Sequence, residues 1–174
     1  MIIRKMENHE INEIRNIDRS EIIEAIYYFK NKTIVKKPEF YDIRGWNENE
    51  LSKSLEKLRN LYEKGGTFLG VFENEQLVGV GVLETKFIGS THDTLQLAFL
   101  HVSNPFRKKG IGAELLQRLG KIAERKGAKK LYISATPSEN TINFYLNQGC
   151  RLVEEVNQEL YEEEPEDIHL ELEL

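Results

Sequence analysis

Cysteine and histidine are scarce in this sequence, and their scarcity excludes several kinds of site. Cys150 is the only cysteine among 174 residues, so no internal disulfide can form and no multi-cysteine metal site is possible. The four histidines, His9, His92, His101 and His169, are widely separated and show no metal-ligand spacing. We therefore expect no bound metal.

Long apolar runs and an excess of basic charge are also missing. No run is long enough to span a bilayer, and the opening segment 1–7 is too short and too soon charged for a secretory signal. The net charge is -5, with basic residues scattered among acidic ones. We expect a cytoplasmic protein without membrane or nucleic-acid partners. Its length and 40% hydrophobic content predict one globular domain over residues 1–174.

The first third of the chain has mostly helical spacing. Residues 2–7 are predicted to form a strand, and apolar residues from Ile11 to Ile26 recur at helical intervals, which predicts one or two amphipathic helices through about residue 30. A loop-like region follows. Leucines from Leu51 to Leu61 then predict another helix, ended by Gly65 and Gly66.

From Thr67 the pattern becomes strand-like and then alternates between strands and helices. The helix from Ile111 has one apolar face and stops at Gly127. The predicted strands cover residues 67–72, 77–86, 94–102, 131–135, 151–156 and 168–174, and the predicted helices cover 111–126 and 138–147.

The segment from Val102 to Ala113 joins a strand to a helix through a basic, glycine-bearing loop. A helix start presents unpaired N–H groups and partial positive charge, which suit a phosphate. Gly110 and Gly112 let a ligand approach the backbone, and Arg107, Lys108 and Lys109 add positive charge. The alternative is a solvated basic turn capped by glycines. Other nucleotide-loop, dinucleotide, GxSxG and HExxH motifs are absent.

Two elements resemble the GNAT superfamily of acyl-CoA-dependent N-acyltransferases. Residues 107–112 resemble its [QR]xxGx[GA] signature, and residues 138–150 resemble its NxxAxxFYxxxGF element, in the same order. The resemblance implies an α/β (α+β) fold with a mixed, mainly antiparallel twisted sheet and helices on both faces. Its fourth and fifth strands, here 94–102 and 131–135, would splay apart. Residues 1–66 would form acceptor-side helices, 67–156 the coenzyme-binding core, and 157–174 a C-terminal loop and strand.

The same resemblance implies roles for individual residues, with acetyl-CoA as co-substrate. Tyr145 would protonate the departing thiolate, which is a sensible role for a hydroxyl near developing negative charge. The acceptor would be a small-molecule or peptide amine, and a homodimer is possible. The implied coenzyme contacts are Leu100, His101 and Val102 for the pantetheine, Arg107, Lys108, Lys109, Gly110, Ile111, Gly112 and Ala113 for the pyrophosphate, and Ser138 and Asn140 for the pantetheine arm.

Three departures from the family pattern leave alternatives open. Ser138 replaces an asparagine, and Cys150 replaces an aromatic residue and is expected to be a small buried side chain. Gln96 occupies the position of a glutamate base, and a glutamine cannot usefully accept a proton. Other candidate bases are Glu84, His92, Asp93 and His101.

The missing glutamate favours one alternative, a non-catalytic acyl-CoA-binding or sensor module. A protein-interaction domain with a basic loop is another. The acidic tract 162–167 could attract a cationic acceptor, but a solvated loop is the favoured interpretation.

Overall fold

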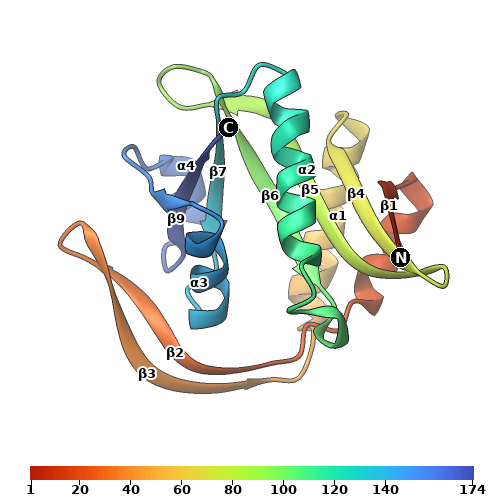
Figure 1. Ribbon diagram of the computed structural model, residues 1–174, viewed down its shortest axis with the longest axis horizontal. Helices are drawn as coiled ribbons and strands as arrows, with labels where there is room; N and C mark the ends of the chain where they lie inside the picture. Colours follow the sequence, from red (N-terminus) through yellow and green to blue (C-terminus); the bar gives the residue numbers. More distant parts are fainter.

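The computed structural model describes residues 1–174 and contains a seven-stranded sheet beside a separate two-stranded sheet (Figure 1). All neighbouring strands of the large sheet are antiparallel except β6 and β7, which are parallel. In spatial order the strands are β1 (Ile2–Lys5), β4 (Thr67–Glu73), β5 (Gln76–Ile88), β6 (Thr94–Val102), β7 (Lys130–Ala135), β9 (Ile168–Glu173) and β8 (Arg151–Leu152).

Helices cover both faces of this sheet, as predicted. On one face, α2 (Ile111–Arg125) and α3 (Glu139–Asn147) bury apolar side chains against β6, β7 and β9. On the other face, the 3-10 helix η1 (Asn8–Asn16) and α1 (Glu48–Glu63) pack on β4 and β5. Two apolar cores therefore lie on either side of the sheet, and their burial is the main favourable term in folding.

Residues 21–43 differ from the prediction, because they form a β-hairpin instead of a helix followed by a loop. Strand β2 (Glu21–Lys30) pairs with β3 (Thr33–Ile43) around a two-residue turn. Asn31 and Lys32 have φ of 52° and 61°, the left-handed conformation that a type I′ turn requires. Branched and aromatic side chains fill both strands, and strand pairing prevails over the helical spacing of the isoleucines.

This hairpin extends beneath the large sheet from the start of α2 towards α3 (Figure 1). The backbone N–H of Tyr27 donates to the carbonyl of Pro137 at 2.8 Å, and the Tyr27 hydroxyl donates to Asn143 Oδ1 at 2.9 Å. At the other end, the backbone N–H of Asn104 donates to the carbonyl of Asp18 at 2.8 Å. The hairpin thus joins the β6 side of the molecule to the α3 side.

Strands β6 and β7 pair over a short stretch and then separate, as the resemblance implied. Their pairing covers only Thr94 to Gln96 on β6, and the two strands diverge beyond it (Figure 1). On the β5 side, Phe99 is opposite Val82 and Leu97 is opposite Leu83, so Ala98 is an extra, bulged residue. A bulge bends its strand and increases the local twist, which is consistent with the divergence.

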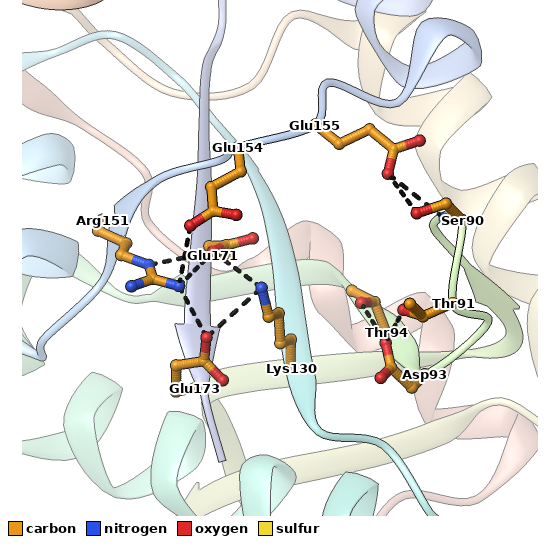
Figure 2. Close-up of polar contacts among 10 residues, drawn as sticks. All are labelled: Ser90, Thr91, Asp93, Thr94, Lys130, Arg151, Glu154, Glu155, Glu171 and Glu173. Carbon is orange, nitrogen blue, oxygen red and sulfur yellow. Dashed lines mark hydrogen bonds and ion pairs between the residues drawn. The ribbon is translucent and has the colours of Figure 1, made fainter.

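Ion pairs fix the end of the sheet where β6 and β7 meet (Figure 2). The carboxylate of Glu171 on β9 forms ion pairs with Lys130 Nζ at 3.1 Å and with Arg151 Nη2 at 2.9 Å. Nearby, the Ser90 hydroxyl donates to Glu155 at 2.8 Å, which ties the β5–β6 turn to the segment after β8. The sheet is therefore closed at this end and open at the end that leads to α2.

Two smaller predictions at the C-terminal end need correction. Strand β8 covers only two residues, not 151–156, and the segment before the last strand contains a short helix, α4 (Gln158–Glu163), where a loop was expected. The Asn157 side chain caps this helix by accepting from the Leu160 N–H at 3.1 Å. No helix in the structure has both the length and the apolarity needed to cross a bilayer.

Candidate active site

The turn between β6 and α2 exposes a row of free backbone donors. It runs through the short 3-10 helix η2 (Asn104–Phe106), and Gly110, with φ of 82°, precedes the first residue of α2. The first bond of the helix is from the Glu114 N–H to the Gly110 carbonyl at 3.0 Å. None of the six amides from Lys108 to Ala113 donates to another group of the chain. Six free N–H groups at the positive end of a helix dipole form a site suited to an anion.

The surroundings of these amides suit a phosphorylated ligand. A hollow of about 440 Å³ is bordered by Gly110, Ala113, Glu114, Leu116, Gln117 and Gln148. The ammonium of Lys108 is exposed and makes no ion pair, and that of Lys109 lies 5.1 Å from the centre of the Phe106 ring. Both lysines can therefore turn towards a bound anion. A larger hollow of about 640 Å³, bordered by residues of η1 and α1, is wide open and lies apart from these amides.

Arg107, one of the predicted coenzyme contacts, has its guanidinium directed towards other parts of the chain. Its Nε donates to the Val102 carbonyl at 2.9 Å and its Nη1 donates to the Ser20 carbonyl at 3.0 Å. The Glu21 carboxylate is 3.9 Å away. The side chain therefore braces the turn against the start of the hairpin.

The free edge of β6 offers further backbone groups. The Ser103 N–H donates to the Val78 carbonyl at 2.9 Å on the β5 side. Because bonding directions alternate along an antiparallel pair, the amides of Leu100 and Val102 point away from β5. No strand lies opposite them, since β7 has already left. The His101 backbone bonds towards β5 by the same alternation, so it is not a free contact of the kind predicted.

Tyr145 lies on α3 in the core beside the splayed strands and is only 6% exposed. Its hydroxyl makes no hydrogen bond within the chain. Burial raises the pKa of Tyr145, with smaller contributions from Cys150 and Asp167. The hydroxyl therefore stays protonated and has a proton to donate. The neighbouring Phe144 is half-buried and would lie 3.3 Å from a Cβ added to Gly112.

Ser138 and Asn140, two of the predicted contacts to the pantetheine, make hydrogen bonds within the protein. Ser138 is the N-cap of α3, accepting from the Thr141 N–H at 3.3 Å and donating to Thr141 Oγ1 at 2.9 Å. The Asn140 amide donates to Glu21 Oε1 at 2.8 Å and so anchors the hairpin. Each side chain satisfies a local structural need.

The structure separates the candidate bases. His92 and Asp93 lie in or beside the β5–β6 turn at the closed end of the sheet, and Asp93 is drawn there in Figure 2, so neither is near the free edge of β6. Burial, followed by the charges of Arg19 and Arg107, lowers the pKa of His101 to about 3. A base that weak is unsuited to an ammonium substrate. Glu84 lies on β5, and its carboxylate accepts a hydrogen bond from the N–H of the next residue, Thr85, at 2.5 Å.

The structure gives specific contacts to two residues that the sequence indicated only by residue type or as part of a tract. Trp46 donates from Nε1 to the Ile17 carbonyl at 2.8 Å, and its ring lies 5.3 Å from that of His101 and 6.3 Å from that of Phe99. Asp167 accepts from the Ser134 hydroxyl at 2.9 Å, and burial raises its pKa to about 6. The aromatic residue type is the only sequence signal for Trp46. The acidic tract 162–167 includes Asp167, but no local signal separates it from its acidic neighbours, because Ser134 is 33 residues away in sequence.

The fold is shared with coenzyme-dependent acetyltransferases of known structure. A candidate streptothricin acetyltransferase from Bacillus anthracis str. Ames in complex with acetyl coenzyme A superposes with a TM-score of 0.73 at 15% identity, covering 99% of this chain and 98% of that one. A nourseothricin acetyltransferase superposes with a TM-score of 0.72 at 13% sequence identity, and the match covers 99% of this chain and 97% of that one. PaiA N-acetyltransferase from Thermoplasma acidophilum in complex with coenzyme A superposes with a TM-score of 0.64 at 19% sequence identity. The match covers 99% of this chain and 98% of that one.

The sequence itself places the chain in this class. Residues 29–150, more than half of the chain, match the Acetyltransferase (GNAT) family. No curated protein sequence matches the chain. The chain therefore belongs to the GNAT family of acetyltransferases, and the resemblance found in residues 107–112 and 138–150 is confirmed at the level of the family.

Proposed function

We propose that this protein transfers the acetyl group of acetyl-CoA to a primary amine by direct attack of the amine on the thioester. The observation that carries the proposal is the row of six unpartnered amides from Lys108 to Ala113 at the start of α2. These groups would bind the pyrophosphate of the coenzyme, with Lys108 and Lys109 adding charge from either side. Glycine at 110 leaves the backbone open to the phosphate oxygens, because a Cβ added there would meet no atom within 4 Å.

The pantetheine arm would run along the free edge of β6 and bond to the backbone of Leu100 and Val102. This placement brings the thioester between the splayed strands, where the Leu100 N–H points towards the gap and can stabilise the oxyanion of the tetrahedral intermediate. Tyr145 lies at the same gap with a free, protonated hydroxyl that can donate to the departing thiolate. Catalysis then depends mainly on positioning, and no covalent enzyme intermediate is needed.

The acceptor is proposed to be a small cationic amine. The similar proteins of known structure include a nourseothricin acetyltransferase, and the α1 face of this chain carries aromatic rings and carboxylates that suit an ammonium group. The second candidate function, a coenzyme sensor, is favoured by one observation: Gln96 stands where a carboxylate base is expected.

An acceptor panel with two readouts tests these functions. Thermal denaturation with acetyl-CoA measures coenzyme binding, and a thiol reagent measures release of CoA in the presence of polyamines, aminoglycoside-type amines and N-terminal peptides. We expect a rise in melting temperature with acetyl-CoA but not with inorganic phosphate, and amine-dependent thiol release. Binding without thiol release for any amine would favour the sensor. No binding would refute both functions.

A further inference from the structure

The carboxylate of Asp167 stands apart from the other acidic side chains of this protein. It immediately precedes β9, is half-buried, and accepts a hydrogen bond from the hydroxyl of Ser134 on β7 at 2.9 Å. No lysine, arginine or histidine lies within ion-pair distance of it. A partly buried carboxylate without a cation is unfavourable for stability alone, which suggests that a ligand supplies the positive charge.

Asp167 lies on the face of the sheet opposite α2. Ile133 and Ala135 point into the core beneath α2 and α3, so Ser134, which lies between them, points to the other face. Its cross-strand partner His169 points the same way, and α4 covers this face there, with the Tyr161 ring 5.9 Å from that of His169. α4 is in turn joined to α1 by the ion pair of Lys57 and Glu163 at 3.1 Å.

A coenzyme held at the start of α2 and an acceptor held at Asp167 would therefore approach the gap between β6 and β7 from opposite faces. Tyr145 links the two positions, because the carboxylate of Asp167 is close enough to contribute to the raised pKa of this tyrosine. The open end of the sheet is the place where both ligands could meet, since β7 no longer pairs with β6 there.

A second polar group on the same face also lacks a partner. The Tyr132 hydroxyl accepts from the Asn157 N–H at 3.1 Å and forms a hydrogen bond with His169 Nδ1 at 2.7 Å. The other ring nitrogen of His169, Nε2, is the one buried side-chain polar atom without a hydrogen bond. His169 is 7% exposed. An unpaired buried polar atom is unfavourable in a folded protein and is tolerated where a ligand forms the missing hydrogen bond.

We propose that Asp167, positioned by Ser134, is the general base that removes a proton from the ammonium group of the acceptor. This inference rests on the proposed acetyltransferase function and fills the role that Gln96 cannot. An N–H bond of the ammonium breaks and an O–H bond forms on the Asp167 carboxylate, leaving a neutral amine. The amine attacks the thioester carbon and the C–S bond breaks. Tyr145 gives its proton to the sulfur and regains one from the new amide nitrogen, while Asp167 releases its proton to solvent.

The electrostatic surroundings of Asp167 fit a base that works near neutral pH. Burial raises its pKa to about 6, the Ser134 hydroxyl lowers it, and the charges of Glu164 and Glu166 on the preceding loop raise it. The titratable groups on neighbouring elements are Tyr145 on α3 and His169 on β9, and burial lowers the pKa of His169, which keeps it neutral. In contrast, hydrogen bonds from neighbouring side chains lower the pKa of Glu10, Asp18, Glu39 and Asp93.

The test compares Asp167→Asn with Glu162→Gln, using the best amine of the panel and acetyl-CoA from pH 5.5 to 9. Asparagine keeps an oxygen that accepts from Ser134, so the fold should survive. Glu162 is an exposed carboxylate of α4 in the same acidic tract, and its loss changes the charge equally. Wild type and Glu162→Gln should show kcat/KM rising with pH through about 6. Asp167→Asn should lose this dependence and fall roughly 10² to 10⁴-fold.

A second variant separates catalysis from structure. Ser134→Ala removes the donor that lowers the pKa of Asp167, so the rise in kcat/KM should move to higher pH while acetyl-CoA affinity is unchanged. If Asp167→Asn keeps the wild-type pH profile and at least a third of its kcat/KM, Asp167 is not the base. If the proposed acetyltransferase function is wrong, the wild-type protein will bind no acetyl-CoA. That result would overturn both proposals and differs from a result that excludes Asp167 alone.

Discussion

Replacing Gly110 with alanine tests the coenzyme site against a matched position at the other end of the same helix. Gly110 has φ of +82° and Gly127, just past the end of α2, has φ of +98°. A Cβ added at either position meets no atom within 4 Å. Both changes therefore carry only the backbone penalty of a left-handed non-glycine residue, roughly 1–2 kcal/mol. Without ligand, each variant should melt a few degrees lower than wild type, by about 2–4 °C per kcal/mol.

The two variants should differ only when acetyl-CoA is present. The new methyl group at position 110 enters the space that a phosphate would occupy and should cost one charged hydrogen bond, roughly 1.5–3 kcal/mol or about 10- to 100-fold in Kd. At a ligand concentration of 100 wild-type Kd, the ligand stabilises wild type by about 2.7 kcal/mol. For Gly110→Ala this stabilisation should fall to between about 1.4 and 0.4 kcal/mol.

Thermal denaturation with and without acetyl-CoA measures both effects in one experiment. Gly127→Ala should gain as much from the ligand as wild type does, and Gly110→Ala should gain clearly less. Equal ligand-induced shifts in the two variants would refute the placement of the pyrophosphate at the start of α2.

Two further predictions concern the residues beside the gap. Tyr145→Phe should lower kcat by roughly 10² to 10⁴-fold, because the proton donor to the thiolate is lost. The affinity for acetyl-CoA should stay within about twofold of wild type, and an unchanged kcat in steady-state assays would exclude this role. Burial raises the pKa of the Cys150 thiol to about 11, so it should resist alkylation in the native protein at pH 7.5 and react only after unfolding. Cys150→Ala should keep its activity, and rapid labelling of native protein would contradict the buried, structural interpretation.

The coenzyme half of the molecule was accessible from sequence because its signals are local. Gly110 and Gly112 mark a helix start where backbone groups must remain open, and the apolar face that begins at Ile111 fixes the helix that follows. Tyr145 and the glycine-containing turn after it can be recognised from their spacing along a single helix. Each of these features depends on residues within about ten positions of one another, so a short window contains the whole pattern.

The hairpin of β2 and β3 shows how a local pattern can mislead. Ile22, Ile23 and Ile26 fit a helical period, but branched and aromatic residues on both sides of Asn31 and Lys32 also suit two strands. The hydrogen bond from the Tyr27 backbone to Pro137 and the contact between Asn140 and Glu21 add tertiary support that no short window contains.

The sequence alone was sufficient for the family, for the order of the strands and α-helices from Thr67 to β8, and for the free amides at the start of α2, because these depend on backbone geometry over short stretches. Tertiary structure alone decided which charged groups remain unpaired. Arg107 is committed to the carbonyls of Val102 and Ser20, whereas Asp167 meets only Ser134. The pKa and the availability of a side chain depend on burial and on neighbours brought from far along the chain, and these are properties of the folded molecule.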